Sequence, residues 1–131
     1  MDLYAENILD HYRNPRNRGE GNGASMTGNE VNPSCGDELT VHLWIENGML
    51  IKLEWEGTGC AISQAGMSIL SEELIGKSVD EVLALKKDDV YALLGVPIGP
   101  RRYKCALLCL HTVKNAFAPQ SWLKTVEIDG E

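Results

Sequence analysis

Two runs of alternating apolar and polar residues, joined by Glu46-Asn47-Gly48, constrain the fold of this chain more than any other segment. Every second side chain is apolar in each run: Leu39, Val41, Leu43 and Ile45 in the first, and Ile51, Leu53 and Trp55 in the second. A period of two is typical of strands with one buried face. Asn-Gly favours a two-residue turn in which both residues take positive φ. The pattern therefore predicts an antiparallel hairpin whose apolar face must be covered.

Helical spacing on both sides of the hairpin predicts the elements that cover it. Before the hairpin, we expect a helix from Asp2, as its cap, to about His11, and a third strand over residues 25–31. After it, we expect four helices: from Ala61 to a stop at Gly76, over residues 78–85 with a capping box between Ser78 and Glu81, over residues 88–94, and from Cys105 to Phe117. Strands first and helices second predict an α+β fold, with helices covering one face of an antiparallel sheet.

Length and charge limit the classes of protein to consider. A chain of 131 residues, 44% of them hydrophobic, predicts a single domain over residues 1–131, with residues 118–131 as a tail after Pro119. The formal charge of -7 argues against a nucleic-acid partner, which needs a concentrated positive field. No apolar run approaches the length of a membrane span, and the first ten residues lack a secretion-signal pattern. We therefore expect a cytoplasmic protein without a membrane partner.

Four cysteines in a reducing compartment are better explained by metal or redox chemistry than by disulfides. Three of them lie at predicted junctions: Cys35 before the first hairpin strand, Cys60 between the second strand and a helix, and Cys105 at the start of the last helix. Junction residues can converge at one end of a sheet. With Asp37, two residues after Cys35, they would make a complete first shell for a tetrahedral metal or a small iron-sulfur cluster.

The surroundings of these thiols favour reactivity. The start of a helix favours a thiolate over a thiol, which applies to Cys60 and Cys105, and Arg102 and Lys104 add positive charge beside Cys105. Cys109, one turn after Cys105 on the apolar side of the helix, is predicted to be a buried core residue. Its spacing also allows it to act as a fourth thiol.

None of the three histidines lies beside a cysteine in the sequence, so we leave all of them out of the predicted shell. His11 is predicted to be solvated at the end of the first helix. His42 is predicted to pack or hydrogen-bond on the polar face of the hairpin, and His111 to turn away from the face that carries Cys105.

Four segments together resemble the IscU/NifU-N/SufU family of iron-sulfur cluster assembly proteins. They match in order over about residues 3–117, and they are Leu9-Asp10-His11-Tyr12-Arg13-Asn14-Pro15-Arg16-Asn17, Asn32-Pro33-Ser34-Cys35-Gly36-Asp37, Gly57-Thr58-Gly59-Cys60-Ala61-Ile62-Ser63 and Lys104-Cys105-Ala106-Leu107-Leu108. Four independent motifs are far more specific than any one of them. The resemblance implies a three-stranded antiparallel sheet and a metal site made by Cys35, Asp37, Cys60 and Cys105.

The resemblance also implies a function. Members accept sulfur from a cysteine desulfurase, assemble a [2Fe-2S] cluster from that sulfur and iron, and pass the cluster to recipient apoproteins. Family members also bind zinc at this site, and thiolates suit both metals. The sequence therefore leaves iron, a [2Fe-2S] cluster and zinc open as occupants.

Two departures place the chain between branches of the family. Lys104 stands where IscU proteins have histidine, as in SufU proteins, yet the span from Cys60 to Cys105 is too short for the insertion typical of SufU. No Leu-Pro-Pro-Val-Lys segment precedes Cys105, so we expect no dedicated Hsp70 chaperone as a partner.

Two functions therefore compete. The first is a non-enzymatic cluster scaffold in which Cys105 accepts the sulfur, while Cys35, Asp37 and Cys60 hold iron. The alternative is a zinc-dependent sulfur acceptor, a sulfurtransferase that stimulates a SufS-type cysteine desulfurase. A purely structural zinc domain is less favoured, because structural sites bring their cysteines as close pairs.

Overall fold

The computed structural model describes residues 3–33, 36–95, 97–100 and 102–117. The predicted cap Asp2, the site residue Cys35 and the predicted tail over residues 118–131 lie outside the described residues. The elements in chain order are α1 (Leu3–Arg13), β1 (Met26–Asn32), β2 (Asp37–Glu46), β3 (Met49–Thr58), α2 (Ala61–Leu74), α3 (Val79–Leu83), α4 (Lys87–Leu94) and α5 (Tyr103–Phe117).

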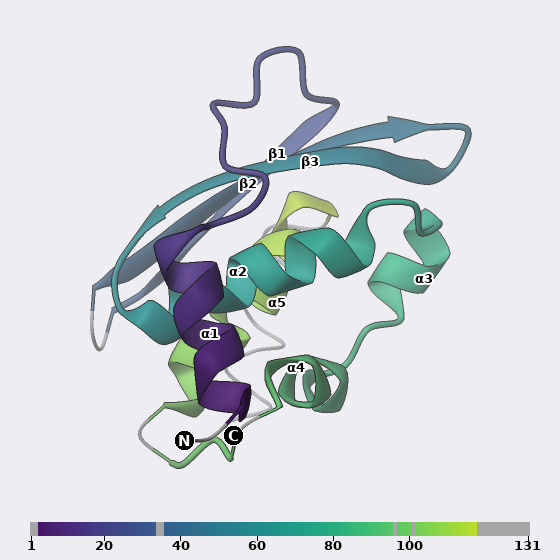
Figure 1. The fold of residues 1–131 in the computed structure, drawn as a ribbon. Helices are drawn as coiled ribbons and strands as arrows, with labels where there is room; N and C mark the ends of the chain where they lie inside the picture. Colours follow the sequence, from purple (N-terminus) through teal and green to yellow (C-terminus); the bar gives the residue numbers. More distant parts are fainter. Residues whose placement is uncertain (1–2, 34–35, 96, 101, 118–131) are drawn as a thin grey trace.

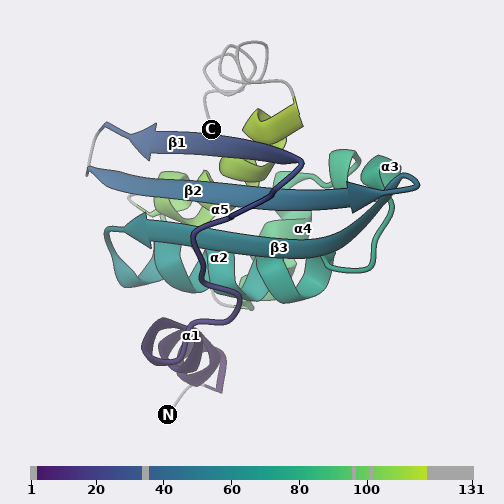
Figure 2. The ribbon, with the colours of Figure 1, turned by 90° about the horizontal axis from the view of Figure 1, so that it is seen from above.

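The three strands form one antiparallel sheet in the order β1-β2-β3. Figure 1 shows the helices on one face of this sheet, and Figure 2 looks onto the other face, with α2, α4 and α5 behind the strands. The α+β prediction is confirmed, because the hairpin strands β2 and β3 carry one apolar face that the helices bury. Among the described residues, no helix is long and apolar enough to cross a membrane.

The hairpin turns at Asn47 and Gly48, which both take positive φ, 52° and 75°. This is the predicted two-residue turn. One part of the predicted register is wrong: Leu50 is fully buried, whereas Ile51 is 46% exposed. The pairing skips Ile51, because Trp44 pairs with Lys52 and Ile45 pairs with Leu50. This bulge places Leu50, rather than Ile51, on the face that carries Leu53 and Trp55.

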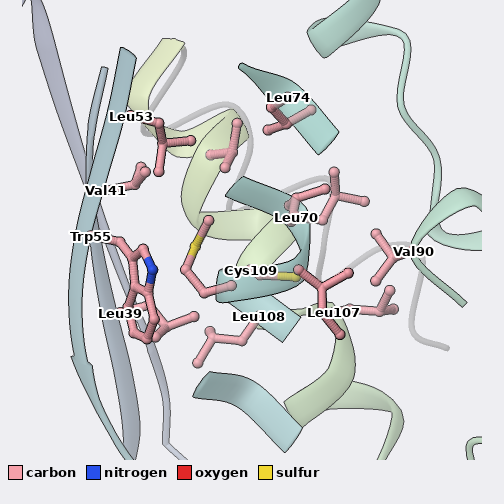
Figure 3. Packing of buried hydrophobic residues seen from close by; sticks show 14 of the residues in the cluster. Leu39, Val41, Leu53, Trp55, Leu70, Leu74, Val90, Leu107, Leu108 and Cys109 are labelled. Carbon is pink, nitrogen blue, oxygen red and sulfur yellow. The ribbon is translucent and has the colours of Figure 1, made fainter. Parts of the chain in front are cut away.

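The core lies between the sheet and helices α2, α4 and α5 (Figure 3). Trp55 of β3 is fully buried in it, and its indole N–H donates to the carbonyl of Arg16 at 2.7 Å. This bond fixes the segment after α1 against the edge of the sheet, where the backbone of Asn17 and Gly19 also bonds to Trp55. Burial of an aromatic ring of this size stabilises the fold by roughly 2 to 3 kcal/mol.

Helix α5 rests directly on the backbone of β1 at Gly28. A Cβ atom at this position would lie 2.6 Å from the amide nitrogen of Ala116 and from the carbonyl oxygen of Thr112. Both are main-chain atoms, which cannot move aside as a flexible side chain would. Glycine is therefore required for α5, the helix that carries Cys105, to sit at this depth.

His11 is buried, which makes the prediction of a solvated histidine wrong. Its side chain is 6% exposed, and its Nδ1 lies 2.7 Å from the hydroxyl of Ser68. The cause is the packing of α1 on α2, which covers the end of α1. Burial, with a smaller contribution from the nearby Arg16 charge, lowers the pKa of His11 below its ordinary value.

Of the two short helices, α3 begins after its predicted cap Ser78, and α4 begins at Lys87, one residue before its predicted start. Ser78 and Glu81 form a reciprocal capping box at the start of α3, with bonds of 3.1 Å and 3.0 Å. Helix α4 ends at Gly95, which takes positive φ. These capping interactions define where α3 begins and where α4 ends in the segment between α2 and α5.

Candidate metal centre

Three of the four predicted ligands meet at one end of the sheet. Asp37 begins β2, Cys60 occupies the N-cap position immediately before α2, and Cys105 lies in the first turn of α5. One oxygen of Asp37 and the two sulfur atoms all lie within 4.8 Å of one another. The starts of β2 and α2 share this end of the sheet because β3 runs antiparallel to β2 and leads into α2 (Figure 2).

The carboxylate of Asp37 is the centre of the hydrogen bonding at this site. Its side chain is nearly fully buried, with only 2% of the residue exposed. Oδ1 accepts the backbone N–H of Cys60 at 3.0 Å, and Oδ2 accepts the hydroxyl of Ser63 at 2.9 Å and the thiol of Cys60 at 3.3 Å. These donors compensate the burial of a charged group. Asp37 thereby supports the start of α2, where the Cys60 side chain makes no capping bond.

Ser63 is a site residue that the sequence analysis missed. It is fully buried in the first turn of α2, and its hydroxyl lies 2.9 Å from Asp37 Oδ2 and 3.4 Å from Cys60 Sγ. The hydroxyl also lies 3.2 Å from the carbonyl oxygen of Cys60, which is farther than its distance to Asp37. The available signal was its position three residues after Cys60, where a side chain points back to the start of the helix.

Gly59 makes room for Asp37. Its φ is +130°, and a Cβ atom there would lie 2.6 Å from Cγ of Asp37. Any other residue would push the carboxylate away from Cys60. In the structure, the group that this glycine admits is the side chain of Asp37.

The two described site cysteines differ in accessibility. Cys60 is half-buried, and Cys105 is 7% exposed. The side-chain amide of Asn32, at the end of β1, lies 4.0 Å from the sulfur of Cys105. Arg102 and Lys104 are both exposed, so their charges face solvent near the start of α5.

Cys109 stands apart from the site. It is fully buried, its thiol donates to the carbonyl of Ala106 at 3.5 Å, and Figure 3 shows it among the apolar side chains of the core. Burial raises its pKa to about 12. The structure agrees with the prediction of a core residue, and a neutral thiol in this position is a poor metal ligand.

Histidines do not take part in the cluster within the described part of the chain. His42 lies on the opposite face of the sheet, where its ring nitrogens lie 3.0 Å from Thr27 Oγ1 and 3.0 Å from Glu56 Oε2. This agrees with the predicted hydrogen-bonding role. The donors at the centre are therefore two thiols and one carboxylate.

This donor set suits a cation that prefers sulfur and tolerates oxygen, such as zinc or iron. Binding requires deprotonated thiols. The thiol of Cys60 donates its proton toward Asp37, so a bound cation would replace that proton between a sulfur and an oxygen. The carboxylate oxygen and both sulfurs lie close enough together to share one cation.

Known proteins resemble the chain over nearly its whole length. A family model described as the NifU-like N terminal domain matches residues 3–121. The iron-sulfur cluster assembly scaffold protein IscU of Thermotoga maritima is 33% identical, over 87% of this chain and 92% of the relative. The zinc-dependent sulfurtransferase SufU of Bacillus subtilis is 31% identical, over 90% of this chain and 91% of the relative.

A similar fold is found in a crystal structure from Fervidobacterium islandicum. That protein is described as an iron-sulfur cluster assembly scaffold protein for the SUF system. The two structures superpose with a TM-score of 0.75 at 28% identity, over 87% of this chain and 96% of the other.

Proposed function

This chain belongs to the family of NifU-like N-terminal domains, and we propose that it is a scaffold on which a [2Fe-2S] cluster is assembled and then passed to recipient apoproteins. The observation that carries the proposal is the convergence of Asp37, Cys60 and Cys105, whose ligand atoms lie within 4.8 Å of one another. A resident structural metal would be served equally well by four thiolates. Oxygen holds iron and zinc less firmly than sulfur does. A carboxylate among the ligands therefore favours a cluster that is bound for a time and then transferred.

We propose Cys35 as the fourth ligand. It precedes Asp37 by two residues, which limits the separation of their Cα atoms to about 7 Å. A ligand at this position would complete a shell of three thiolates and one carboxylate. The whole chain would act as one domain in the cytoplasm, with residues 118–131 as a tail.

Cys105 is the proposed sulfur acceptor. Its thiolate attacks the terminal sulfur of a persulfide on the desulfurase, a new sulfur–sulfur bond forms on Cys105, and the desulfurase cysteine leaves as a thiolate. Reduction of that sulfur to sulfide needs two electrons from a thiol or ferredoxin-type reductant. Iron held by Cys35, Asp37 and Cys60 would then receive the sulfide. Exposed Arg102 and Lys104 would help a desulfurase dock beside Cys105.

Anaerobic reconstitution tests this function. The full chain is mixed with ferrous iron, L-cysteine, a cysteine desulfurase and dithiothreitol as reductant. We expect the visible absorption of a [2Fe-2S] cluster, followed by transfer of the cluster to an apoferredoxin. A protein that stays colourless, or that never releases its cluster, would contradict the proposal.

Cysteine variants provide the control. Cys60→Ala and Cys105→Ala should each abolish stable cluster formation. Cys109→Ala removes a thiol one turn farther along the same helix, inside the core, and should leave reconstitution intact. Equal loss in all three variants would point to a general effect on the fold.

A zinc-dependent sulfur acceptor is the second candidate function. Two observations favour it: lysine occupies position 104, and a zinc-dependent sulfurtransferase is among the relatives. In this reading Cys35, Asp37, Cys60 and Cys105 would hold zinc at rest, and the thiolate of Cys105 would attack the desulfurase persulfide once it is no longer bound to the metal. Protein purified in air should then contain bound zinc and stimulate desulfurase turnover without iron. Absence of stimulation would exclude this candidate.

A further inference from the structure

We infer that Ser63 is a positioning residue of the metal centre, whose hydroxyl holds the carboxylate of Asp37 in the orientation that binds the metal. The inference rests on the proposed function, because it assumes that Asp37, Cys60 and Cys105 share a cation. It assigns a role to a serine that is not itself a ligand.

The geometry places this hydroxyl between two ligands. Ser63 Oγ lies 2.9 Å from Asp37 Oδ2 and 3.4 Å from Cys60 Sγ. Its single proton could instead go to the carbonyl of Cys60, but that contact is longer, at 3.2 Å. A carboxylate also attracts a donor more strongly than a neutral carbonyl does. Donation to Asp37 is therefore the favoured arrangement.

The two oxygens of Asp37 are held by different partners. The backbone N–H of Cys60 holds Oδ1, and this bond does not involve the side chain at position 63. Oδ2 is the oxygen that also faces the sulfur of Cys60, and it accepts the hydroxyl of Ser63. A hydrogen bond to this second oxygen restricts rotation of the carboxylate about its Cβ–Cγ bond. Ser63 thus fixes the plane in which Asp37 presents its lone pairs to the metal.

Metal binding strengthens the need for this bond. The thiol of Cys60 loses its proton when it binds a metal, so it stops donating to Oδ2. Ser63 then remains as the described side chain that donates to that oxygen. An oxygen of an ionised carboxylate can accept a hydrogen bond and bind a cation at the same time, since it has two lone pairs.

The chain offers a closely matched control in Ser68. It lies in the same helix, is equally buried, and its hydroxyl also contacts two groups, the ring of His11 at 2.7 Å and the N–H of Arg16 at 2.9 Å. These partners belong to the contact between α1 and α2. Ser68→Ala should therefore disturb packing to a similar extent without touching the metal centre.

The experiment measures metal affinity on the full-length chain. Zn²⁺ affinity is determined by competition with a chelator for the wild type, Ser63→Ala and Ser68→Ala, and circular dichroism of the metal-free proteins verifies the fold. Ser63→Ala should bind zinc roughly 10- to 100-fold more weakly, and Ser68→Ala should match the wild type. The absorption spectrum of the Co²⁺-loaded Ser63→Ala protein should shift toward that of Asp37→Ala, because the first variant loosens the oxygen ligand and the second removes it.

A double-mutant cycle tests whether Ser63 acts through Asp37. Adding Ser63→Ala to Asp37→Ala should cause little further loss of zinc affinity, because the carboxylate that the hydroxyl positions is already absent. Full additivity, or equal zinc affinities for Ser63→Ala and the wild type, would overturn the inference alone. A wild-type chain that binds no zinc and no cobalt would overturn the metal centre itself, and the inference with it.

Discussion

The carboxylate of Asp37 accepts the backbone N–H of Cys60 at 3.0 Å, although the two residues are 23 positions apart in the sequence. The acid that begins β2 therefore supports the first turn of α2, and the same acid is a proposed metal ligand. The folding of this end of the sheet and the assembly of the site depend on one side chain.

Replacement of Asp37 separates these two roles. Asp37→Ala leaves the N–H of Cys60 and the hydroxyl of Ser63 without their acceptor, which should lower the free energy of unfolding by about 1 to 3 kcal/mol. Asp37→Asn keeps an oxygen for Cys60 and should lose less. Asp37 is proposed to be the labile ligand through which the cluster leaves, and both variants remove its carboxylate. A bound cluster should therefore live longer and transfer more slowly to an apoferredoxin. Faster transfer would contradict the role of Asp37 as the labile ligand. Thermal unfolding of the metal-free proteins provides the stability measurement.

Gly59→Ala should damage the metal centre specifically. The residue has a φ of +130°, and the added Cβ would meet the carboxylate of Asp37. Gly76→Ala is the control, because Gly76 has a φ of +98° but no atom within 4 Å of the added Cβ. Both variants should lose about 1 to 3 kcal/mol of stability from backbone strain. Only Gly59→Ala should also lose zinc affinity, as measured by chelator competition.

Most of the fold could be predicted from local patterns, since alternation, turn chemistry and capping signals depend on nearby residues. The two errors arose where tertiary contacts decide. Ile51 lost its core position to Leu50 because pairing at Trp44 shifts by one residue. His11 is buried because α1 packs on α2, and no periodicity within α1 reveals which helix covers its end.

The proposed ligands of the metal centre are visible in the sequence, whereas the residue that supports them is not. Cysteines at element junctions are visible in the sequence, and so is the acid beside Cys35. The role of Ser63 depends on the distance between its hydroxyl and Asp37, two residues from different elements. Such a contact exists only once the sheet has formed, so a single sequence gives no direct signal of it.

Cys109 should resist alkylation in the folded protein. Burial raises its pKa to about 12, so almost no thiolate is present at neutral pH. After treatment with iodoacetamide, mass spectrometry should find Cys109 unmodified while the half-buried Cys60 is modified. Denaturant should make Cys109 react. Modification of Cys109 at the rate of Cys60 under native conditions would contradict its placement in the core.

Stability should fall when the pH drops below the ordinary pKa of histidine. Burial and the charge of Arg16 lower the pKa of His11, although Glu72 at 3.7 Å partly opposes them. The unfolded chain therefore binds a proton that the folded chain does not. This contribution to stability is complete above about pH 6.5 and is lost as the pH falls toward the lowered pKa.

His11→Gln provides the comparison for this prediction. Its melting temperature should depend less on pH than that of the wild type between about pH 7 and pH 5, because the variant has no proton to bind at this position. Identical pH profiles for the two proteins would show that His11 is accessible to protons in the folded state.

The contact of Gly28 with the main chain of α5 has a consequence for how such a protein can change over time. Core side chains can be exchanged for others of similar volume, and cores generally adapt to such exchanges with modest loss of stability. The seat of α5 is set instead by one backbone resting on another. Substitutions can therefore accumulate in the interior while the thiol of Cys105 keeps its place beside Asp37 and Cys60. Evolutionary change in the core side chains would then leave the geometry of the metal centre unaltered.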